Sequence, residues 1–297
     1  MNTTALIVTF NRLTKLKECW ARTREVAFTH IVIVDNASSD GTRAWLSTLD
    51  EPRLTLLRSE RNLGGAGGFR YGADYIVSRL DTHWVVFYDD DSWPCADFIA
   101  RFSEVRDARW GGYCGKVVNT RHHLCKMNLP YIALPRTFFG DIRAMLGGGP
   151  VAPDGQRAVD VDTFSFVGAI LDKRILEQSL GYIFADLFIY YDDLYFSYHL
   201  RLQGCRIRYS PELMFIHDIP SETSGIAPKW KVYYLVRNLL LSRRLFQAHR
   251  PYSWGAIGLR ICKYLGLGLY QSGKIEYTKY VLSGIWDGLS GKTGKKF

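Results

Sequence analysis

Three consecutive aspartates, Asp89, Asp90 and Asp91, constrain this chain more than any other feature of its sequence. They follow the apolar run 84–88, which has the composition of a buried β-strand. Adjacent carboxylates repel one another, so such a cluster at the exit of a buried strand calls for a cation. Mg²⁺ and Mn²⁺ take oxygen ligands, usually one or two carboxylates plus the phosphates of a substrate. The triplet therefore predicts a metal–diphosphate site; the alternative is a solvated acidic turn.

The first third of the chain alternates between strand-like and helix-like patterns. Buried strands are predicted for the apolar runs at 5–10, 30–34, 54–58 and 84–88. Helices are predicted between them at 13–24, 42–49 and 69–80. This order indicates βαβ units, and therefore an α/β fold with a mostly parallel sheet and helices on both faces.

Polar clusters follow each predicted strand directly. They are Asn11-Arg12, Asp35-Asn36, the glycine-rich run 62–68 and the aspartate triplet. Ligands of parallel sheets bind at the carboxyl ends of the strands, which meet at one edge. The convergence of the clusters supports a single site there more strongly than any one cluster does.

The rest of the chain is less regular. Residues 109–160, with Gly147-Gly148-Gly149-Pro150, read as short strands and loops, and a strand at 162–171 returns to the core. A helix follows Asp192-Asp193 as far as 203, and short strands at 206–209 and 213–216 end at His217. Helical patterns then cover 229–246 and 254–270, before a tail at 291–297 that is expected to be flexible and basic.

Charge and cysteine usage narrow the class of protein. The formal net charge is +9, and the acids beyond residue 220 are Glu222, Glu276 and Asp287, so an anionic partner is expected. Nucleic-acid binding would place basic residues over the strand ends, where carboxylates stand instead.

The six cysteines are scattered without a C-x-x-C pair, which favours reduced thiols in the cytosol and argues against zinc. No signal segment and no run of about 18 apolar residues is found, so no membrane-spanning helix is expected.

The remaining candidate residues each have two interpretations. The glycine run fits neither a dinucleotide fingerprint nor a Walker motif, but its backbone could approach a diphosphate, or it could be a flexible turn. Asp35 could bind a nucleoside or cap a helix. Of Asp192 and Asp193, one could be a base whose pKa is raised by burial, and one a first-turn acid of the following helix. His217 could complete a metal site or be a structural histidine.

Taken together, these motifs resemble the inverting glycosyltransferases of family 2, which have the GT-A nucleotide-sugar-binding fold. The resemblance rests, in the family's order, on residues 8–12, 34–41, 62–69, 88–94, Tyr191-Asp192-Asp193 and His217. The glycine run, the triplet and the aromatic-Asp-Asp most resemble bacterial galactofuranosyltransferases, with polysaccharide rhamnosyltransferases as near neighbours. The chain lacks the large N-terminal β-domain of the mycobacterial type, which puts processive polymerisation in doubt.

The resemblance implies a role for each matching residue. The residues expected to contact the nucleotide sugar are Thr9, Arg12, Asp35, Asn62, Gly64, Gly65, Gly68, Asp89 and Asp90. The expected ligands of Mn²⁺ or Mg²⁺ are Asp89, Asp91 and His217, with Asp91 the firmest. Asp90, although in the first set, is expected to face elsewhere and to be structural. Asp192 is the expected general base.

The implied protein is a GT-A catalytic domain at 1–220 followed by a basic helical region at 221–297. It would transfer galactofuranose from UDP-galactofuranose to an oligosaccharide or lipid-linked acceptor in bacterial cell-surface polysaccharide or lipopolysaccharide synthesis. The alternatives are a rhamnosyltransferase using dTDP-rhamnose and a non-catalytic nucleotide-sugar-binding protein. Basic and aromatic C-terminal helices fit a cytoplasmic enzyme held peripherally on the inner membrane surface. The alternatives are ordinary helices that close the acceptor side of the core, or a dimer interface.

Overall fold

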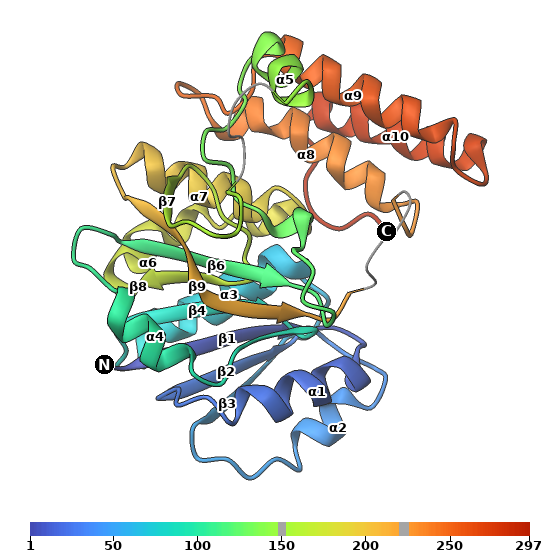
Figure 1. Ribbon diagram of the computed structural model, residues 1–297. Helices are drawn as coiled ribbons and strands as arrows, with labels where there is room; N and C mark the ends of the chain where they lie inside the picture. Colours follow the sequence, from blue (N-terminus) through green and yellow to red (C-terminus); the bar gives the residue numbers. More distant parts are fainter. Residues whose placement is uncertain (148–152, 220–225) are drawn as a thin grey trace.

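The computed structural model describes residues 1–147, 153–219 and 226–297, and its described part is built around one nine-stranded sheet (Figure 1). The strand order is β3-β2-β1-β4-β8-β6-β9-β5, with β7 paired to β9. Gly148, Gly149 and Pro150, within the region expected to form short strands and loops, and the expected domain boundary at 220/221 lie outside the described residues. The strands are β1 (Thr3–Thr9), β2 (His30–Asp35), β3 (Leu54–Arg58), β4 (Trp84–Asp89), β5 (Ser92–Pro94), β6 (Gly112–Val118), β7 (Val159–Val161), β8 (Ala169–Asp172) and β9 (Ile207–His217).

The first four strands form the parallel half of the sheet, as the alternating pattern predicts. β1 pairs in parallel with both β2 and β4, and the register places Thr9 opposite Asp35 and Val8 opposite Asp89. β3 extends the sheet in parallel beyond β2. Because these strands end at the same level, the polar residues that follow them gather at one edge, which confirms the predicted convergence.

The second half of the sheet is mixed. β8 runs antiparallel to β4 and β6, while β6 runs parallel to β9. The strand expected at 162–171 was too long: regular pairing covers only β8 at its end, and β7 lies just before it. The two short strands expected at 206–209 and 213–216 are one strand, β9, whose pairing with β6 shifts register between Gly115 and Lys116.

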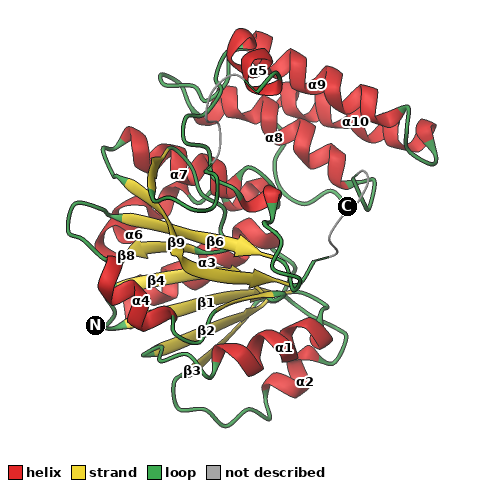
Figure 2. Ribbon diagram, viewed as in Figure 1, coloured by secondary structure: helices red, strands yellow, loops and turns green. Residues whose placement is uncertain are grey.

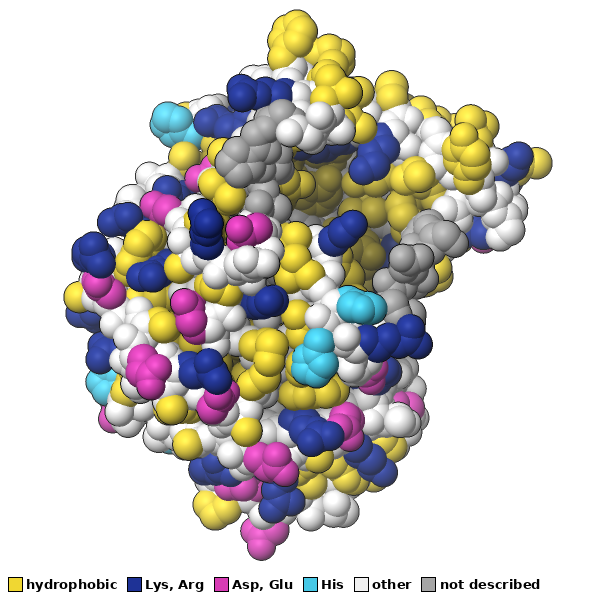
Figure 3. Space-filling view, viewed as in Figure 1, with side chains coloured by type: hydrophobic (Ala, Val, Ile, Leu, Met, Phe, Trp, Pro, Cys, Tyr) yellow, Lys and Arg dark blue, Asp and Glu magenta, His cyan; other side chains and the backbone are white. Residues whose placement is uncertain are grey.

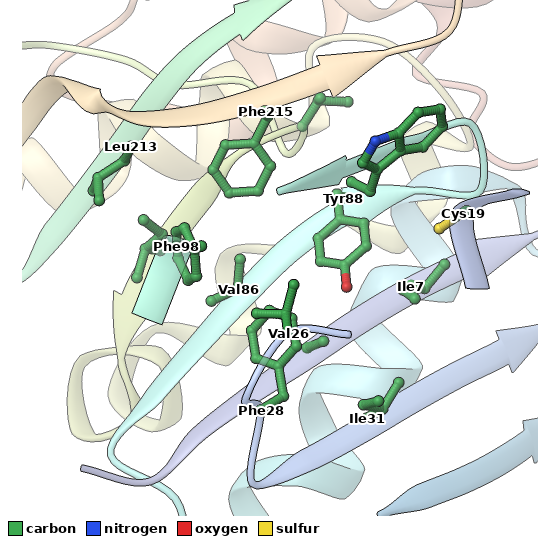
Figure 4. Packing of buried hydrophobic residues seen from close by; sticks show 14 of the residues in the cluster. Ile7, Cys19, Val26, Phe28, Ile31, Val86, Tyr88, Phe98, Leu213 and Phe215 are labelled. Atoms are coloured by element: carbon green, nitrogen blue, oxygen red, sulfur yellow. The ribbon is translucent and has the colours of Figure 1, made fainter. Parts of the chain in front are cut away.

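Helices cover both faces of the sheet, because successive side chains of a strand point to opposite faces. Ala5 and Ile7 of β1 point to the face covered by α1, α2 and α4, where Tyr88, Phe98 and Phe215 pack in the core (Figure 4). Leu6 and Val8 point to the other face, covered by α3, α6 and α7. The helices are α1 (Leu13–Thr23), α2 (Thr42–Leu46), α3 (Gly64–Arg79), α4 (Phe98–Val105), α6 (Lys173–Ser179) and α7 (Asp192–Leu202), with 3₁₀ turns η1 (Lys126–Asn128), η2 (Leu180–Tyr182) and η3 (Ala185–Leu187).

The glycine run is the start of helix α3 and not the loop that its composition suggests. A Cβ atom on Gly68 would lie 2.5 Å from Val8 Cγ1, and one on Gly72 would lie 2.3 Å from Leu6 Cδ1. These glycines therefore let α3 pack very closely on β1, which outweighs the low helix propensity of glycine.

A separate helical layer lies above the sheet (Figure 2). It contains α5 (Phe138–Met145), α8 (Lys231–Leu245), α9 (Trp254–Gly268) and α10 (Lys274–Ser290), and α5 and α10 were not anticipated. Most of its buried apolar side chains form one cluster with Tyr195 and Tyr198 of α7, while Tyr233 and Tyr234 of α8 pack with Phe188. None of the described helices combines the length and apolar character needed to span a bilayer.

The C-terminal tail was expected to be flexible, but it packs back onto α8. The backbone amides of Lys296 and Phe297 donate to Tyr234 Oη at 2.9 and 3.1 Å. The Lys296 ammonium lies 2.6 Å from Asp287 Oδ2. The tail thus closes one side of the space between the helical layer and the sheet.

Candidate active site

A cavity of about 1030 Å³ opens between the carboxyl edge of the sheet and the helical layer. In Figure 3 the surface is hollowed beneath that layer. The cavity is lined by most of the residues that the sequence singles out: Thr9, Arg12, Asn62, Gly64, Gly65, Asp89, Asp90, Asp91, Asp192 and His217. Asp35 and Gly68 are not among the described residues that line it.

Asp90 is the member of the aspartate triplet with the most hydrogen bonds. Its carboxylate accepts from Thr9 Oγ1 at 2.7 Å and from Arg12 Nη1 at 3.0 Å. Arg12 Nη2 also donates to Asp91 Oδ2 at 2.7 Å. Burial raises the pKa of Asp90 to about 6 and that of Asp89 to about 7, and the charge of Asp91 adds to both shifts. Protein groups therefore hold both oxygens of Asp90, and its structural role stays a prediction.

Asp91 and His217 meet across the strand ends of β4 and β9. His217 Nε2 lies 3.3 Å from Asp91 Oδ1, which would make an ion pair with a protonated ring. Asp91 Oδ1 is nevertheless buried and has no hydrogen bond of good geometry among the described residues. His217 Nδ1 lies 3.0 Å from Asn128 Oδ1, and if Nδ1 carries the proton, the Nε2 lone pair faces this unpaired oxygen.

A divalent cation fits that arrangement, because it would bind both the unpaired oxygen and the imidazole, with Asn128 orienting the ring. No complete cage of three Asp, Glu, His or Cys side chains occurs in the described part of the chain. Ions such as Mg²⁺ are commonly held by one or two carboxylates plus substrate phosphates. The residues present therefore suit a metal that binds together with a diphosphate.

The structure does not bring Asp35 into the cavity. Asp35 is 2% exposed, and its Oδ1 accepts from the backbone amide of Ser38 at 2.9 Å, closing a turn after β2. The neighbouring Asn36 lines the cavity instead. It accepts from the Leu63 amide at 3.0 Å and donates to the Gly64 carbonyl at 2.8 Å, which fixes the start of α3. A nucleoside contact for Asp35 stays a prediction.

The two aspartates at the start of α7 have different surroundings. Asp193 Oδ1 accepts from the Leu194 amide at 2.7 Å, and Ser165 and Phe166 also bond to this carboxylate. Asp193 therefore has the structural contacts expected of one member of the pair. Both aspartates line the cavity, and burial, with a smaller contribution from the charge of Asp193, raises the pKa of Asp192 to about 8.

Several residues that line the cavity were given no role of their own by the sequence reasoning. They are Asn36, Asn128, Tyr190, Trp230, Lys231, Lys295 and Phe297. Burial lowers the pKa of Lys231, and the nearby charge of Arg12 lowers it further, against the charges of Asp91 and Asp89. This lysine thus places a cation beside the triplet. The only signal for it in the sequence was the general excess of basic residues in the C-terminal quarter.

Comparison with known proteins agrees with the geometry. Residues 4–164 match the family described as glycosyl transferase family 2. The low-salt glycan biosynthesis hexosyltransferase Agl10 of Haloferax volcanii is 23% identical over 98% of this chain and 92% of its own length. The dTDP-rhamnosyl transferase RfbF of Shigella flexneri is 23% identical over 99% of this chain and 97% of its own length. The galactofuranosyltransferase GlfT1 of Mycolicibacterium smegmatis is 38% identical, but over only 22% of this chain and 21% of its own length.

A solved structure shares the architecture. The mannosyltransferase PcManGT from Pyrobaculum calidifontis, determined in complex with GDP-Man and Mn²⁺, has a TM-score of 0.58 and 16% identity. The structural alignment covers 98% of this chain and 88% of the mannosyltransferase chain. The likeness confirms the GT-A fold that the sequence motifs predict.

Proposed function

Because this chain belongs to glycosyl transferase family 2 and is a glycosyltransferase of glycan biosynthesis, we propose that it is an inverting, metal-dependent hexosyltransferase. One observation supports this most: Asp91 and His217 at the sheet edge and Asp192 at the start of α7 line the same cavity. A diphosphate-bound cation and a base would thus act from two different elements on one sugar. A non-catalytic binding protein would not need the base.

The proposed reaction is a single displacement. The Asp192 carboxylate takes the proton of an acceptor hydroxyl, whose oxygen bonds to C1 of the sugar while the bond from C1 to the phosphate oxygen breaks. The nucleoside diphosphate leaves with that bonding pair, and attack from the opposite face inverts C1. A bound Mg²⁺ or Mn²⁺ would offset the charge that develops on the diphosphate. Arg12 and Lys231, whose charges lie close enough to interact, add positive charge to the cavity.

For the donor, we propose UDP-galactofuranose first and dTDP-rhamnose as the alternative. The motifs of the site support galactofuranose, as does the 65-residue match to a galactofuranosyltransferase. The relative that aligns along nearly the whole chain and is named a dTDP-rhamnosyl transferase supports the alternative. The acceptor is a glycan or a lipid-linked saccharide.

A panel of sugar nucleotides tests the donor. With Mn²⁺ present, we expect UDP-galactofuranose to be consumed at least about tenfold faster than UDP-galactopyranose or dTDP-rhamnose, on the scale by which pocket contacts separate similar substrates. Mass spectrometry measures released UDP or dTDP and the glycosylated product. Faster release of dTDP from dTDP-rhamnose would establish the alternative donor, and no turnover with any nucleotide sugar would contradict the proposed function.

We also propose that the enzyme docks on an anionic membrane surface through the α9–α10 hairpin. The hairpin end exposes Leu269, Tyr270 and Ile275, at 65%, 88% and 76% of their surfaces. Exposed Lys274 precedes Ile275 in the chain, and exposed Lys279 lies one helical turn beyond it. Apolar side chains beside lysines suit the interface of an anionic bilayer, where a lipid-linked acceptor would be found.

Liposome flotation tests this surface. Replacing Leu269, Tyr270 and Ile275 together with serine should reduce binding to phosphatidylglycerol-containing vesicles at least about tenfold, since each large apolar side chain contributes about 1.5–3 kcal/mol when fully buried. The matched control is Tyr71→Ser with Leu202→Ser, which changes exposed apolar residues of α3 and α7. Equal flotation of both variants and the unchanged protein would contradict the assignment.

A further inference from the structure

The segment 187–191, which leads directly into Asp192, has an unusual backbone. Phe188, Tyr190 and Tyr191 have φ angles of 70°, 66° and 66°. Bulky residues rarely adopt this left-handed region, and they stay there only where the surrounding structure holds them. The position of Asp192 therefore depends on whatever holds this segment.

Two fully buried polar residues of α8 hold it. Asn238 Nδ2 donates to the carbonyls of Leu187, Ile189 and Tyr190 at 3.1, 2.8 and 2.9 Å. An amide group has two hydrogens, so these three acceptors use all its donor capacity. Arg237 Nε donates to Asn238 Oδ1 at 2.9 Å, which fixes the orientation of the amide, and Arg237 Nη2 donates to the Leu187 carbonyl at 2.8 Å.

Helix α3 holds the same segment from the other side. The Ala66 amide donates to the Phe188 carbonyl at 3.1 Å. A Cβ atom on Gly64 would lie 2.1 Å from that carbonyl oxygen, so only glycine allows the approach. Segment 187–191 is thus clamped between the start of α3 and the middle of α8.

We infer that Asn238, oriented by Arg237, is a positioning residue that sets the location of the Asp192 carboxylate in the cavity. The inference rests on the proposed role of Asp192 as general base. Without the Asn238 amide, the Ile189 and Tyr190 carbonyls lose their donor, the Leu187 carbonyl keeps only Arg237, and the α8 side of the clamp on the left-handed backbone is weakened. Asp192, the next residue along the chain, would move away from the acceptor hydroxyl. Asn238 and Arg237 of the helical layer therefore act on catalysis without lining the cavity themselves.

A double-mutant cycle between Asn238 and Asp192 tests the inference. Asn238→Ala alone should lower kcat about 10–100-fold, while UDP binding measured by calorimetry changes less than about twofold. In the Asp192→Asn background the same change should lower kcat less than about threefold, because there is no longer a base to position. Ser242→Ala is the matched control, a buried polar residue of α8 whose hydroxyl donates to the Leu239 carbonyl at 2.7 Å, and it should leave kcat unchanged.

Three outcomes would overturn the inference: an unchanged kcat in Asn238→Ala, an equal loss in both backgrounds, or a parallel loss of UDP binding. If circular dichroism shows that Asn238→Ala does not fold, the cycle is run with Asn238→Ser, which keeps one hydroxyl donor. Failure of the proposed function would give a different result. The protein with native Asn238 and Asp192 would then show no turnover that Asp192→Asn reduces. Additive losses with an active parent enzyme would reject only the role of Asn238.

Discussion

Replacing Asp192 with asparagine should lower kcat by about 10²–10⁴-fold, the usual contribution of a general base. Asparagine has nearly the same shape as aspartate but accepts no proton at this position. Asp192 lines the cavity from α7, whereas the expected metal ligands Asp91 and His217 come from the ends of β4 and β9. Donor binding, measured as the affinity for UDP with Mn²⁺, should therefore change less than about twofold. Steady-state kinetics with the preferred donor and acceptor gives kcat and KM separately.

The pH dependence provides a second readout for Asp192. Burial raises the pKa of this carboxyl to about 8, so its proton-accepting form predominates above that pH. In the native enzyme kcat should therefore fall as the pH is lowered below about 8, and Asp192→Asn should lose this limb of the profile. Asp193→Asn is the matched control, expected to affect mainly the stability of α7 because Asp193 bonds to the Leu194 amide. If Asp193→Asn loses turnover while Asp192→Asn keeps it, the base is Asp193.

The sequence predicted best those features that depend only on residues close together in the chain. Strands β1 to β4 were predicted within a few residues because each is a short apolar run next to its own polar terminus. Their shared parallel direction then brought Thr9 and Asp89 to one edge, as the register shows. The convergence of polar residues at this edge was thus predictable from the alternation of strands and helices together with the residues that follow each strand.

The remaining features come from contacts between distant parts of the chain. Local propensity favours a loop at Gly64–Gly68, but close packing on β1 and the approach of the Phe188 carbonyl make it the start of a helix. Lys231 and Phe297 line the cavity only because α8 and the tail dock over the sheet edge. No periodicity or motif near either residue carries that information.

Removing the metal, or removing Asp91 as its firmest predicted ligand, should also lower the rate of sugar transfer strongly. With EDTA present, transfer should fall by about 10³-fold, equivalent to about 4 kcal/mol of transition-state stabilisation, and added Mn²⁺ or Mg²⁺ should restore it. Asp91→Asn should cause a loss of similar size that added metal does not restore. Full transfer in a metal-free assay would contradict the metal assignment.

Metal binding itself can be measured apart from turnover. Asp91 Oδ1 is buried without a hydrogen bond and faces His217 Nε2 at 3.3 Å, so Asp91→Asn removes an oxygen that no protein donor satisfies. Paramagnetic resonance of Mn²⁺ in the presence of UDP should show weaker binding to Asp91→Asn and to His217→Ala. Asp97→Asn, a change at an exposed carboxylate paired with Arg101, should bind Mn²⁺ as the native protein does.

The contributions of Asp91 to folding stability and to metal binding can be measured separately. Asp91→Asn removes one of three mutually repelling carboxylates and leaves Arg12 its bond to Asp90, so the thermal unfolding temperature without metal should fall little. The increase in unfolding temperature that Mn²⁺ and UDP give the native protein should, however, be largely lost, because a ligand stabilises only through its affinity for the folded state. A variant that keeps the full increase would show that the cation is held elsewhere and that Asp91 serves only to pair Arg12 and His217.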